Sequence, residues 1–345
     1  MKDIAKLVRK NIAALEPYST ARDEYKGSLG ILLDANENPY DNGINRYPST
    51  SLKEQLRDCV ALIKLIDPDC LFLGNGSDEA IDLCYRVFCE PGKDNAVIMA
   101  PSYGMYSVCA DINDIERRMV MLEPETFALP VEKLLAATDS RTKLMFICSP
   151  NNPTGNAFDI SDIERLAAEF GGMLVVDEAY IDFSSKPGVL PLLEKYPNLI
   201  VLQTLSKAWG MAGLRIGLAM SSPYIISVFK QVKYPYNIGA DTIALALEQL
   251  KGDVSHQVAE IVAERDRLFS GLSEAACVKK VYPSDANFLL VKVTDPRGLY
   301  NALLQEGVIV RDRSRVALCE GCLRITVGTP QENAKMEKII YAYES

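Results

Sequence analysis

The stretch KLMFICSPNNPTGNAFDISDIERLAAEFGGMLVVDEAY, residues 143–180, decides the fold class of this chain. Two short and almost continuously apolar runs, 143–149 and 173–180, enclose the segment 160–170, in which apolar residues recur at helical spacing. Outward from this unit, similar apolar runs are found at LFLG (71–74), AVIMA (96–100) and LIVLQTLS (199–206). Apolar strands that alternate with amphipathic helices are typical of a sheet covered on both faces. The sequence therefore predicts an α/β domain with a mostly parallel central sheet.

The character of the chain changes after about residue 240. A long helical stretch is followed by the apolar segments ANFLLVKV (286–293) and LRITVG (323–328) and by a terminal helix. This order is typical of a smaller α+β domain. We therefore expect a large domain over residues 31–240, a small C-terminal domain over 241–345, and an N-terminal arm over 1–30 that packs with the small domain.

Composition and charge exclude several classes of protein. The 345 residues are 48% hydrophobic and carry a net charge of −9, which disfavours binding to nucleic acid or to an anionic membrane. The single histidine, His256, excludes a site built from several histidines, and we expect no bound metal. The nine cysteines lie mostly in apolar or helical runs, and the N-terminus lacks the apolar core of a signal peptide. We therefore expect a cytoplasmic protein with reduced thiols.

Lys207 is the most informative single residue. It directly follows the apolar run 199–206 and is flanked by small residues, which do not suit a solvated charged face. A partly buried amine has a lowered pKa that favours Schiff-base chemistry. Arg215 follows eight residues later among glycines, and Thr204 and Ser206 add hydroxyl groups on the same stretch. We interpret this segment as a reactive lysine beside an anion site that suits a phosphate.

Asp177 places a carboxylate directly after four apolar residues of the run 173–180. A buried carboxylate needs a cationic partner, and a protonated pyridine ring would be one. Tyr180, three residues later, offers a phenol for a second substituent of such a ring. The alternative interpretation is a helix N-cap aspartate beside a core tyrosine.

Three further segments follow the ends of expected strands, where ligands bind in α/β sheets. Asn152 lies in the turn sequence SPNNPTGN, and Tyr103, in PSYGMY, offers a flat face for stacking on an aromatic ring. The segment GNGSDE (74–79) precedes a helix for which Ser77 is the predicted N-cap. It lacks the third glycine of a dinucleotide-binding loop, but backbone N–H groups near Ser77 favour a phosphate.

In this order, the segments GNGSDEAI, SPNNPTG, VVDEAY, TLSKAWGMAGLRIG and LRITVG closely resemble the fold-type I pyridoxal-phosphate aminotransferases, and they span residues 74–328. A second set narrows the resemblance to the histidinol-phosphate aminotransferase family: LEPYSTAR, LDANENPY, NRYP, PSYGMYS, ANFLLVK and VIVRDRS. Trp209 stands where that family usually has phenylalanine, and it keeps an aromatic ring at the position.

The resemblance implies the cofactor pyridoxal 5'-phosphate and a role for each matched residue. Lys207 would hold the cofactor covalently and move a proton, Asp177 would pair with the pyridinium nitrogen, and Tyr103 would stack on the ring. Tyr180 and Asn152 would bond the phenolic oxygen. The cofactor phosphate would be held by Arg215, Ser206, Thr204 and the N–H groups of Gly76 and Ser77.

The same resemblance implies a homodimer and two small substrates, histidinol phosphate and glutamate or 2-oxoglutarate. Tyr47 would reach the cofactor phosphate of the neighbouring subunit, and Arg324 would clamp a substrate carboxylate bidentately. Arg311 would offset the charge of the substrate phosphate. The implied substrate-binding residues are Tyr18, Asn36, Arg311 and Arg324.

Two kinds of alternative stay open. An L-threonine-phosphate decarboxylase or an aromatic aminotransferase needs the same cofactor residues, and only the substrate-binding residues separate them from the first interpretation. A nicotinamide-binding dehydrogenase or a non-catalytic binding domain would use the GNGSDE loop. This second kind leaves Lys207, Asp177 and Arg215 unexplained.

Overall fold

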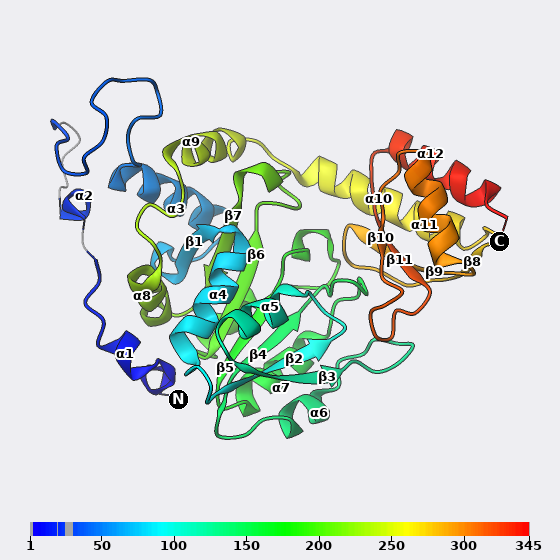
Figure 1. Ribbon diagram of the computed structural model, residues 1–345, viewed down its shortest axis with the longest axis horizontal. Coiled ribbons are helices and arrows are strands. Elements are labelled where there is room, and N and C mark those ends of the chain that lie inside the picture. Colours follow the sequence, from blue (N-terminus) through cyan, green and yellow to red (C-terminus); the bar gives the residue numbers. More distant parts are fainter. Residues whose placement is uncertain (1–2, 19, 25–29, 345) are drawn as a thin grey trace.

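The computed structural model describes residues 3–18, 20–24 and 30–344. Figure 1 shows a large domain around a central sheet, with a C-terminal domain at one end of the long axis and an N-terminal arm at the other. The first described residues therefore lie against the large domain, and the last ones lie in the C-terminal domain.

The large domain is built on a sheet with the strand order β1-β7-β6-β5-β4-β2-β3. Strands β3, β2, β4, β5 and β6 are parallel, whereas β7 is antiparallel to both of its neighbours, β6 and β1. The predicted α/β class and mostly parallel sheet are confirmed. The strands are β1 (Leu71–Asn75), β2 (Asn95–Ala100), β3 (Glu116–Met121), β4 (Thr142–Cys148), β5 (Met173–Asp177), β6 (Leu199–Thr204) and β7 (Ile216–Met220).

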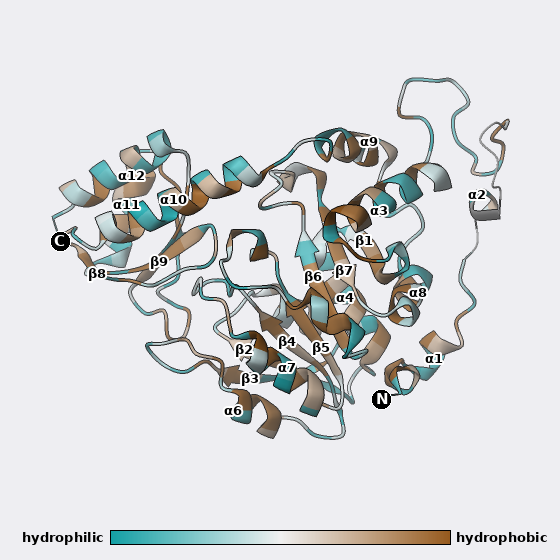
Figure 2. Cartoon of the chain, turned by 180° about the vertical axis from the view of Figure 1, so that it is seen from behind, coloured by the Kyte–Doolittle hydropathy of each residue, from teal (hydrophilic) through white to brown (hydrophobic). Residues whose placement is uncertain are grey.

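Helices cover both faces of this sheet because successive side chains of a strand point to opposite faces. In β5, Leu174 and Val176 join the core beneath α3, α6, α7 and α9, whereas Met173 and Val175 join the core beneath α1, α4, α5 and α8. Figure 2 shows these strands in brown between helices with teal outer faces. The helices are α1 (Lys10–Ala13), α3 (Thr50–Lys64), α4 (Gly76–Phe88), α5 (Met105–Ile112), α6 (Val131–Ala136), α7 (Ile160–Glu169), α8 (Pro223–Val232) and α9 (Ala240–Gln249).

The C-terminal domain has a core of its own between an antiparallel sheet, of strand order β10-β11-β9-β8, and helices. Its elements are α10 (Ser255–Leu272), β8 (Val278–Val281), β9 (Phe288–Val293), α11 (Pro296–Gln305), β10 (Arg311–Asp312), β11 (Cys322–Thr326) and α12 (Pro330–Ala342). Short 3₁₀ helices and one further turn of helix lie elsewhere: η1 (Ile4–Leu7), α2 (Ala21–Glu24), η2 (Pro68–Cys70), η3 (Ile181–Phe183), η4 (Leu190–Glu194) and η5 (Ala212–Leu214).

The N-terminal arm does not pack with the C-terminal domain, and that prediction is wrong for the residues described. Ile4, Val8 and Ile12 are buried in the large-domain core beside α4 and α8. The backbone N–H of Arg9 also donates to the carbonyl of Val87 at the end of α4. Because these three apolar residues recur every four positions, they form one apolar face on the arm, and the large domain covers that face.

Helix α9 follows the expected domain boundary at residue 240 but shares the core of the large domain. Ile243 and Ala246 pack with Leu56 and Val60 of α3. The domain ranges 31–240 and 241–345 therefore stay predictions. Along the chain, α10 is the first helix that contributes to the separate C-terminal core.

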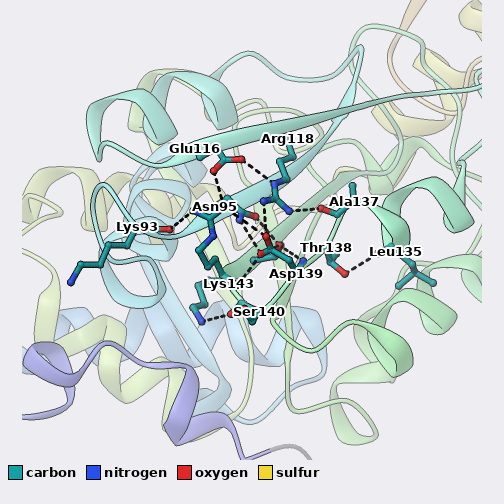
Figure 3. A network of polar contacts seen from close by, with 12 residues as sticks. Lys93, Asn95, Glu116, Arg118, Leu135, Ala137, Thr138, Asp139, Ser140 and Lys143 are labelled. Carbon is teal, nitrogen blue, oxygen red and sulfur yellow. Dashed lines mark hydrogen bonds and ion pairs between the residues drawn. The ribbon is translucent and has the colours of Figure 1, made fainter.

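A polar network closes the edge of the sheet at the N-terminal ends of its strands (Figure 3). The Thr142 hydroxyl donates to Asn95 Oδ1 over 2.7 Å, and the Asn95 amide donates to Asp139, which also accepts from Arg118. This edge lies opposite the strand ends that carry the candidate site. Among the described residues, no helix is both long and apolar enough to cross a membrane.

Candidate active site

A cavity lies where β4, β5 and β6 end, beside the start of α4. Asp177 is the last residue of β5, and Thr204 is the last residue of β6. Nine of the residues predicted from the sequence line this one cavity: Ser77, Tyr103, Asn152, Asp177, Tyr180, Thr204, Ser206, Lys207 and Arg215. Asp78, Cys148 and Ala179 complete the lining. The fold thus brings together residues that are up to 138 positions apart, from 77 to 215.

The phosphate-sized corner of the cavity is formed by the first turn of α4 and by Arg215. The Arg215 guanidinium lies 3.4 Å from the Ser206 hydroxyl and 3.5 Å from Asp78 Oδ2. The first N–H groups of a helix lack partners within the helix, and they attract anions. This corner therefore offers a cation, hydroxyl groups and backbone donors to one anion.

Two glycines keep this corner open. Gly76 has φ +72°, and a Cβ atom there would lie 2.5 Å from Arg215 Nη2. A Cβ atom on Gly217 would lie 2.0 Å from the backbone nitrogen of Ser77. Both distances are far below van der Waals contact, which means that side chains at these positions would displace the anion-binding groups.

The structure corrects two details of the sequence prediction here. Helix α4 begins at Gly76 with Asn75 at the N-cap position, and Ser77 therefore lies inside the first turn. The N–H of Gly76 donates to the backbone carbonyl of Arg215 over 2.6 Å, and it is thus already satisfied. The backbone donors that remain for an anion start at Ser77.

Asp177 is buried, with only 3% of its surface exposed. Its Oδ2 accepts from the Tyr106 hydroxyl over 2.7 Å, and its Oδ1 accepts from the N–H of Ala179 over 3.0 Å. Burial raises the pKa of Asp177 to about 6, against the opposing effect of the bond from Tyr106. A cationic group placed in the cavity would restore the ionised form of this carboxylate.

Lys207 stands at the mouth of the cavity. The residue as a whole is exposed, and it lines the cavity, where its amine is partly desolvated. The ammonium nitrogen lies 5.7 Å from the centre of the Tyr180 ring. Desolvation and the nearby guanidinium groups of Arg324 and Arg215 lower the pKa of Lys207. A lowered pKa increases the fraction of free amine, which is the form that attacks a carbonyl group.

Tyr180 and Asn152 meet at the wall between the two domains. The Asn152 amide donates to the Tyr180 hydroxyl over 3.3 Å, while its oxygen accepts from Arg324 over 2.6 Å. Phe288 of β9 packs edge-on against the Tyr180 ring and lies beneath the Arg324 guanidinium, at 5.2 and 5.3 Å respectively. These contacts connect the predicted ring-binding residues to a predicted substrate arginine.

Tyr103 lies on the opposite side, at the start of α5. Its hydroxyl donates to Asp78 Oδ1 over 3.1 Å, and its ring packs edge-on against Tyr106 with 5.6 Å between ring centres. The ring lines the cavity beside the strand ends. It is therefore placed where it could stack on a planar ligand.

Arg311 and Arg324 are direct cross-strand neighbours. They are register partners in the antiparallel pair of β10 and β11, and their side chains therefore project from the same face. Arg313, two residues on, is half-buried, and burial together with Arg324 and Arg311 lowers the pKa of its guanidinium. Among the described residues, none of the three arginines forms an ion pair, and the Nε atoms of Arg313 and Arg324 are buried without a hydrogen-bond partner. Asp312, the neighbour of Arg311 in the chain, accepts instead from the N–H and the hydroxyl of Ser314.

Tyr18, Asn36 and Tyr47 lie outside this cavity. Tyr18 is exposed and lines a different cavity beside α3 and α8. Tyr47 is 49% exposed and stacks on Tyr236, with 4.3 Å between ring centres. Asn36 is exposed on the same arm. Within a single subunit, these three residues therefore do not line the cavity that holds the other predicted cofactor-binding residues.

Three lining residues, Asp78, Cys148 and Ala179, escaped the sequence prediction, and so did Tyr106 and Arg313, which lie beside Asp177 and Arg324. Tyr106 follows Tyr103 at the helical spacing of three, and Arg313 follows Arg311 at the strand spacing of two. A spacing of three on a helix and a spacing of two on a strand each place both residues on the same face. These spacings could therefore have revealed Tyr106 and Arg313 in the sequence. Asp78 and Cys148 carried no comparable signal, because one reads as a first-turn acid and the other as a core residue.

The cavity fits a pyridoxal phosphate ligand and does not fit a dinucleotide. Pyridoxal phosphate is a phosphorylated pyridine aldehyde. The buried carboxylate of Asp177 suits its ring nitrogen, the corner kept open by Gly76 and Gly217 suits its phosphate, and the amine of Lys207 suits its aldehyde. A dinucleotide loop requires a parallel βαβ unit. However, β1 pairs only with the antiparallel strand β7, at the edge of the sheet. Among the described residues, no group of three or more His, Cys, Asp or Glu side chains is arranged to hold a metal ion.

Comparisons with known proteins agree with this geometry. The family model for aminotransferase class I and II matches residues 31–340. The histidinol-phosphate aminotransferase of Parabacteroides distasonis is 53% identical over 335 residues, 96% of each chain, and that of Bacteroides thetaiotaomicron is 50% identical over the full length of both chains. The fold is also similar to the histidinol-phosphate aminotransferase of Sinorhizobium meliloti solved with pyridoxal-5'-phosphate. That structure gives a TM-score of 0.77 at 21% identity, over 86% of this chain and 82% of the other.

Proposed function

The chain belongs to the class I and II aminotransferases and, among them, to the histidinol-phosphate aminotransferases, and on this basis we propose that it transfers the amino group between histidinol phosphate and 2-oxoglutarate with pyridoxal 5'-phosphate as cofactor. The products are imidazole acetol phosphate and glutamate, and the reaction is reversible. This is a step of histidine biosynthesis.

Bound pyridoxal phosphate supplies an aldehyde that takes up the amino group and a ring that accepts the electron pair released at the substrate carbon. Lys207 provides the amine that attaches the cofactor and later carries the proton to and from the reacting carbon. Asp177 holds a proton on the pyridine nitrogen, because its buried carboxylate gains a cationic partner there.

The rest of the cavity orients the cofactor. The phosphate would be held by Arg215, Ser206, Thr204 and the first turn of α4 at Ser77, in the corner that Gly76 and Gly217 leave open. The Tyr103 ring would stack on the pyridine, and Tyr180 and Asn152, which are hydrogen-bonded to each other, would donate to its phenolic oxygen.

The arginine cluster carries the substrate assignment. Arg311, Arg313 and Arg324 lie close together, and Arg324 joins them to the cavity through its hydrogen bond to Asn152. None of the three forms an ion pair among the described residues. A phosphate monoester brings about two negative charges near neutral pH, and it would balance these cations. In the other half-reaction, Arg324 would bind a carboxylate of glutamate bidentately. We therefore assign substrate binding to Arg311 and Arg324, with Arg313 beside them.

A homodimer would complete the site. Tyr18, Asn36 and Tyr47 belong to the chain segment before α3, which runs along and beyond the edge of the large domain in Figure 1, and none of them lines the cavity of its own chain. This segment exposes large apolar side chains, among them Ile31 at 91% and Leu33 at 84%. Such exposure is typical of a surface that another chain covers. Tyr47 would then reach the cofactor phosphate of the partner subunit, with Tyr18 and Asn36 closing over the partner's substrate.

A cytoplasmic location is part of the same proposal. All nine cysteines fall among the described residues and are free, and seven of them are buried. Such unpaired thiols are typical of a reducing compartment.

The deciding experiment offers the purified protein histidinol phosphate, phenylalanine and threonine phosphate, each with 2-oxoglutarate, while glutamate formation and decarboxylation are followed. We expect glutamate from histidinol phosphate and no release of carbon dioxide from threonine phosphate. Decarboxylation of threonine phosphate, or a preference for phenylalanine, would instead favour one of the two related enzymes. Borohydride treatment followed by peptide mapping should locate the reduced cofactor on Lys207.

A further inference from the structure

Tyr106 is a buried phenol that the reaction described above does not use. It lies in α5 with no measurable exposure, and its hydroxyl donates to Asp177 Oδ2 over 2.7 Å. Burial, followed by the charge of Asp177, raises the pKa of this phenol well above its usual range. Tyr106 therefore keeps its proton near neutral pH, and it remains a hydrogen-bond donor.

The Tyr106 ring is fixed by a stack of aromatic side chains. It lies on Phe146 with 5.0 Å between ring centres, and Phe146 lies on Tyr85 with 5.2 Å between centres. The Tyr85 hydroxyl donates to the backbone carbonyl of Tyr106 over 2.8 Å. Because the ring cannot rotate away, the phenol is held at the carboxylate whether or not a ligand is present.

The bond from Tyr106 also fixes the direction of the carboxylate. Asp177 Oδ1 is held by the N–H of Ala179, and Oδ2 is held by Tyr106. With one donor on each oxygen, the carboxylate is held in one orientation, and each oxygen keeps a lone pair for a group in the cavity that Asp177 lines.

Other charged and titratable groups also act on Asp177. The Lys207 ammonium lowers its pKa and the Asp78 carboxylate raises it, and the Tyr180 hydroxyl and the Cys148 thiol lie close on the neighbouring elements. Among the groups that favour the ionised carboxylate, the Tyr106 hydrogen bond has the largest effect.

We propose that Tyr106 is a positioning residue for the cofactor: its hydrogen bond keeps Asp177 ionised and aimed, and the proton of the Asp177–pyridine pair therefore stays on the ring nitrogen. Without this donor, the pair would remain, but its proton would move to the carboxylate and leave a neutral pyridine. A neutral ring accepts the electron pair of the substrate carbon poorly. The inference rests on the proposed function, because it requires bound pyridoxal phosphate.

The test uses the holoenzyme with pyridoxal phosphate labelled with ¹⁵N in the ring, and no amino-acid substrate. The ¹⁵N chemical shift distinguishes a protonated from a neutral pyridine. We expect a protonated ring in the unmodified enzyme. In Tyr106→Phe we expect the ratio of protonated to neutral ring to fall by roughly 10- to 100-fold, the equivalent of one hydrogen bond to a charged group.

Tyr85→Phe is the matched control, because it removes a buried hydroxyl that donates only to the Tyr106 backbone and keeps both the stacked rings and the Tyr106 phenol. It should leave the ring protonated. A second variant, Tyr106→Leu, removes the same hydroxyl with different packing and should shift the signal in the same direction as Tyr106→Phe. Thermal unfolding and cofactor absorbance establish that each variant is folded and loaded.

A protonated ring in Tyr106→Phe, or an equal shift in Tyr85→Phe, would overturn the inference while leaving the proposed function intact. An unmodified protein that takes up no cofactor would overturn the proposed function. Because no substrate is present, the ¹⁵N result does not depend on whether histidinol phosphate is the amino donor.

Discussion

Arg324 Nη1 donates a hydrogen bond to Asn152 Oδ1 over 2.6 Å, and this bond joins the C-terminal domain to the strand ends of the large domain. The Asn152 amide nitrogen donates in turn to Tyr180. One side chain therefore orients both a substrate-binding cation and a phenol at the cofactor. The two halves of the site are held in register by this amide, and the geometry leads to four predictions.

Replacing Asn152 with alanine should impair both halves of the site. Arg324 and Tyr180 each lose a buried partner, and we expect kcat/KM for histidinol phosphate to fall by roughly 10- to 100-fold. Steady-state kinetics would measure the effect. Asn156→Ala is the control, because Asn156 lies in the same loop and bonds the carbonyl of Phe127 instead. Equal losses in the two variants would show that loop stability, rather than the Arg324 bond, is responsible.

Replacing Arg311 with alanine should separate the two substrates. We expect KM for histidinol phosphate to rise by roughly 10- to 100-fold, because a charge-assisted bond to the phosphate is lost, while cofactor affinity is unchanged. KM for glutamate should rise less, since Arg324 remains. Arg315→Ala removes an exposed arginine of the same segment and serves as the control. An unchanged KM for histidinol phosphate in Arg311→Ala would refute this assignment.

Mixing two inactive variants should restore activity if the sites are shared between subunits. Lys207→Ala lacks the attaching amine, and Tyr47→Phe lacks the phenol that we assign to the partner's site. In a mixed dimer, one site has both changes and the other has neither. We therefore expect activity to return when the variants are refolded together. Each mixed dimer should then contribute the activity of one native site. Mixed dimers that form but stay inactive would contradict the role given to Tyr47.

Glu178 should make the cofactor-free protein less stable as the pH rises. Its carboxyl is buried, and burial raises its pKa from 4.5 to about 7. The folded protein therefore binds this proton more tightly than the unfolded chain. The stabilisation is complete below about pH 4.5 and is lost as the pH rises through about 7, by at most about 1.4 kcal/mol per pH unit.

Glu178→Gln should flatten this dependence, because the amide does not ionise. Gln203 can accept its new N–H, since the Gln203 oxygen is buried without a partner. Urea unfolding between pH 4 and 8 gives the free energies, and Glu194→Gln, at an exposed glutamate, is the control. Parallel pH profiles for the native protein and Glu178→Gln would contradict the raised pKa.

Much of the fold was accessible from the sequence, but two strands of the large sheet were not. β3 was missed because ERRMVM is largely exposed at the sheet edge and lacks the continuous apolar run of a buried strand. β7 was missed because its residues directly follow Arg215 in a glycine-rich segment that reads as a loop. Its antiparallel direction depends on pairing with β6 and β1, which no local pattern encodes.

The sequence by itself determined the cofactor side of the site. Lys207, Asp177, Asn152 and Arg215 each follow or adjoin a strand, and parallel strands bring their ends to one edge of the sheet. Local order along the chain was therefore enough to predict their proximity.

Only the tertiary structure decided the contacts that depend on register and packing. Arg311 faces Arg324 because β10 pairs with β11 at that register, and Tyr106 reaches Asp177 because α5 packs on that face of the sheet. Tyr47 lies outside the cavity of its own chain because its ring stacks on Tyr236. Such contacts join residues far apart in sequence, and their geometry is set by the packing of whole elements rather than by any local pattern of side chains.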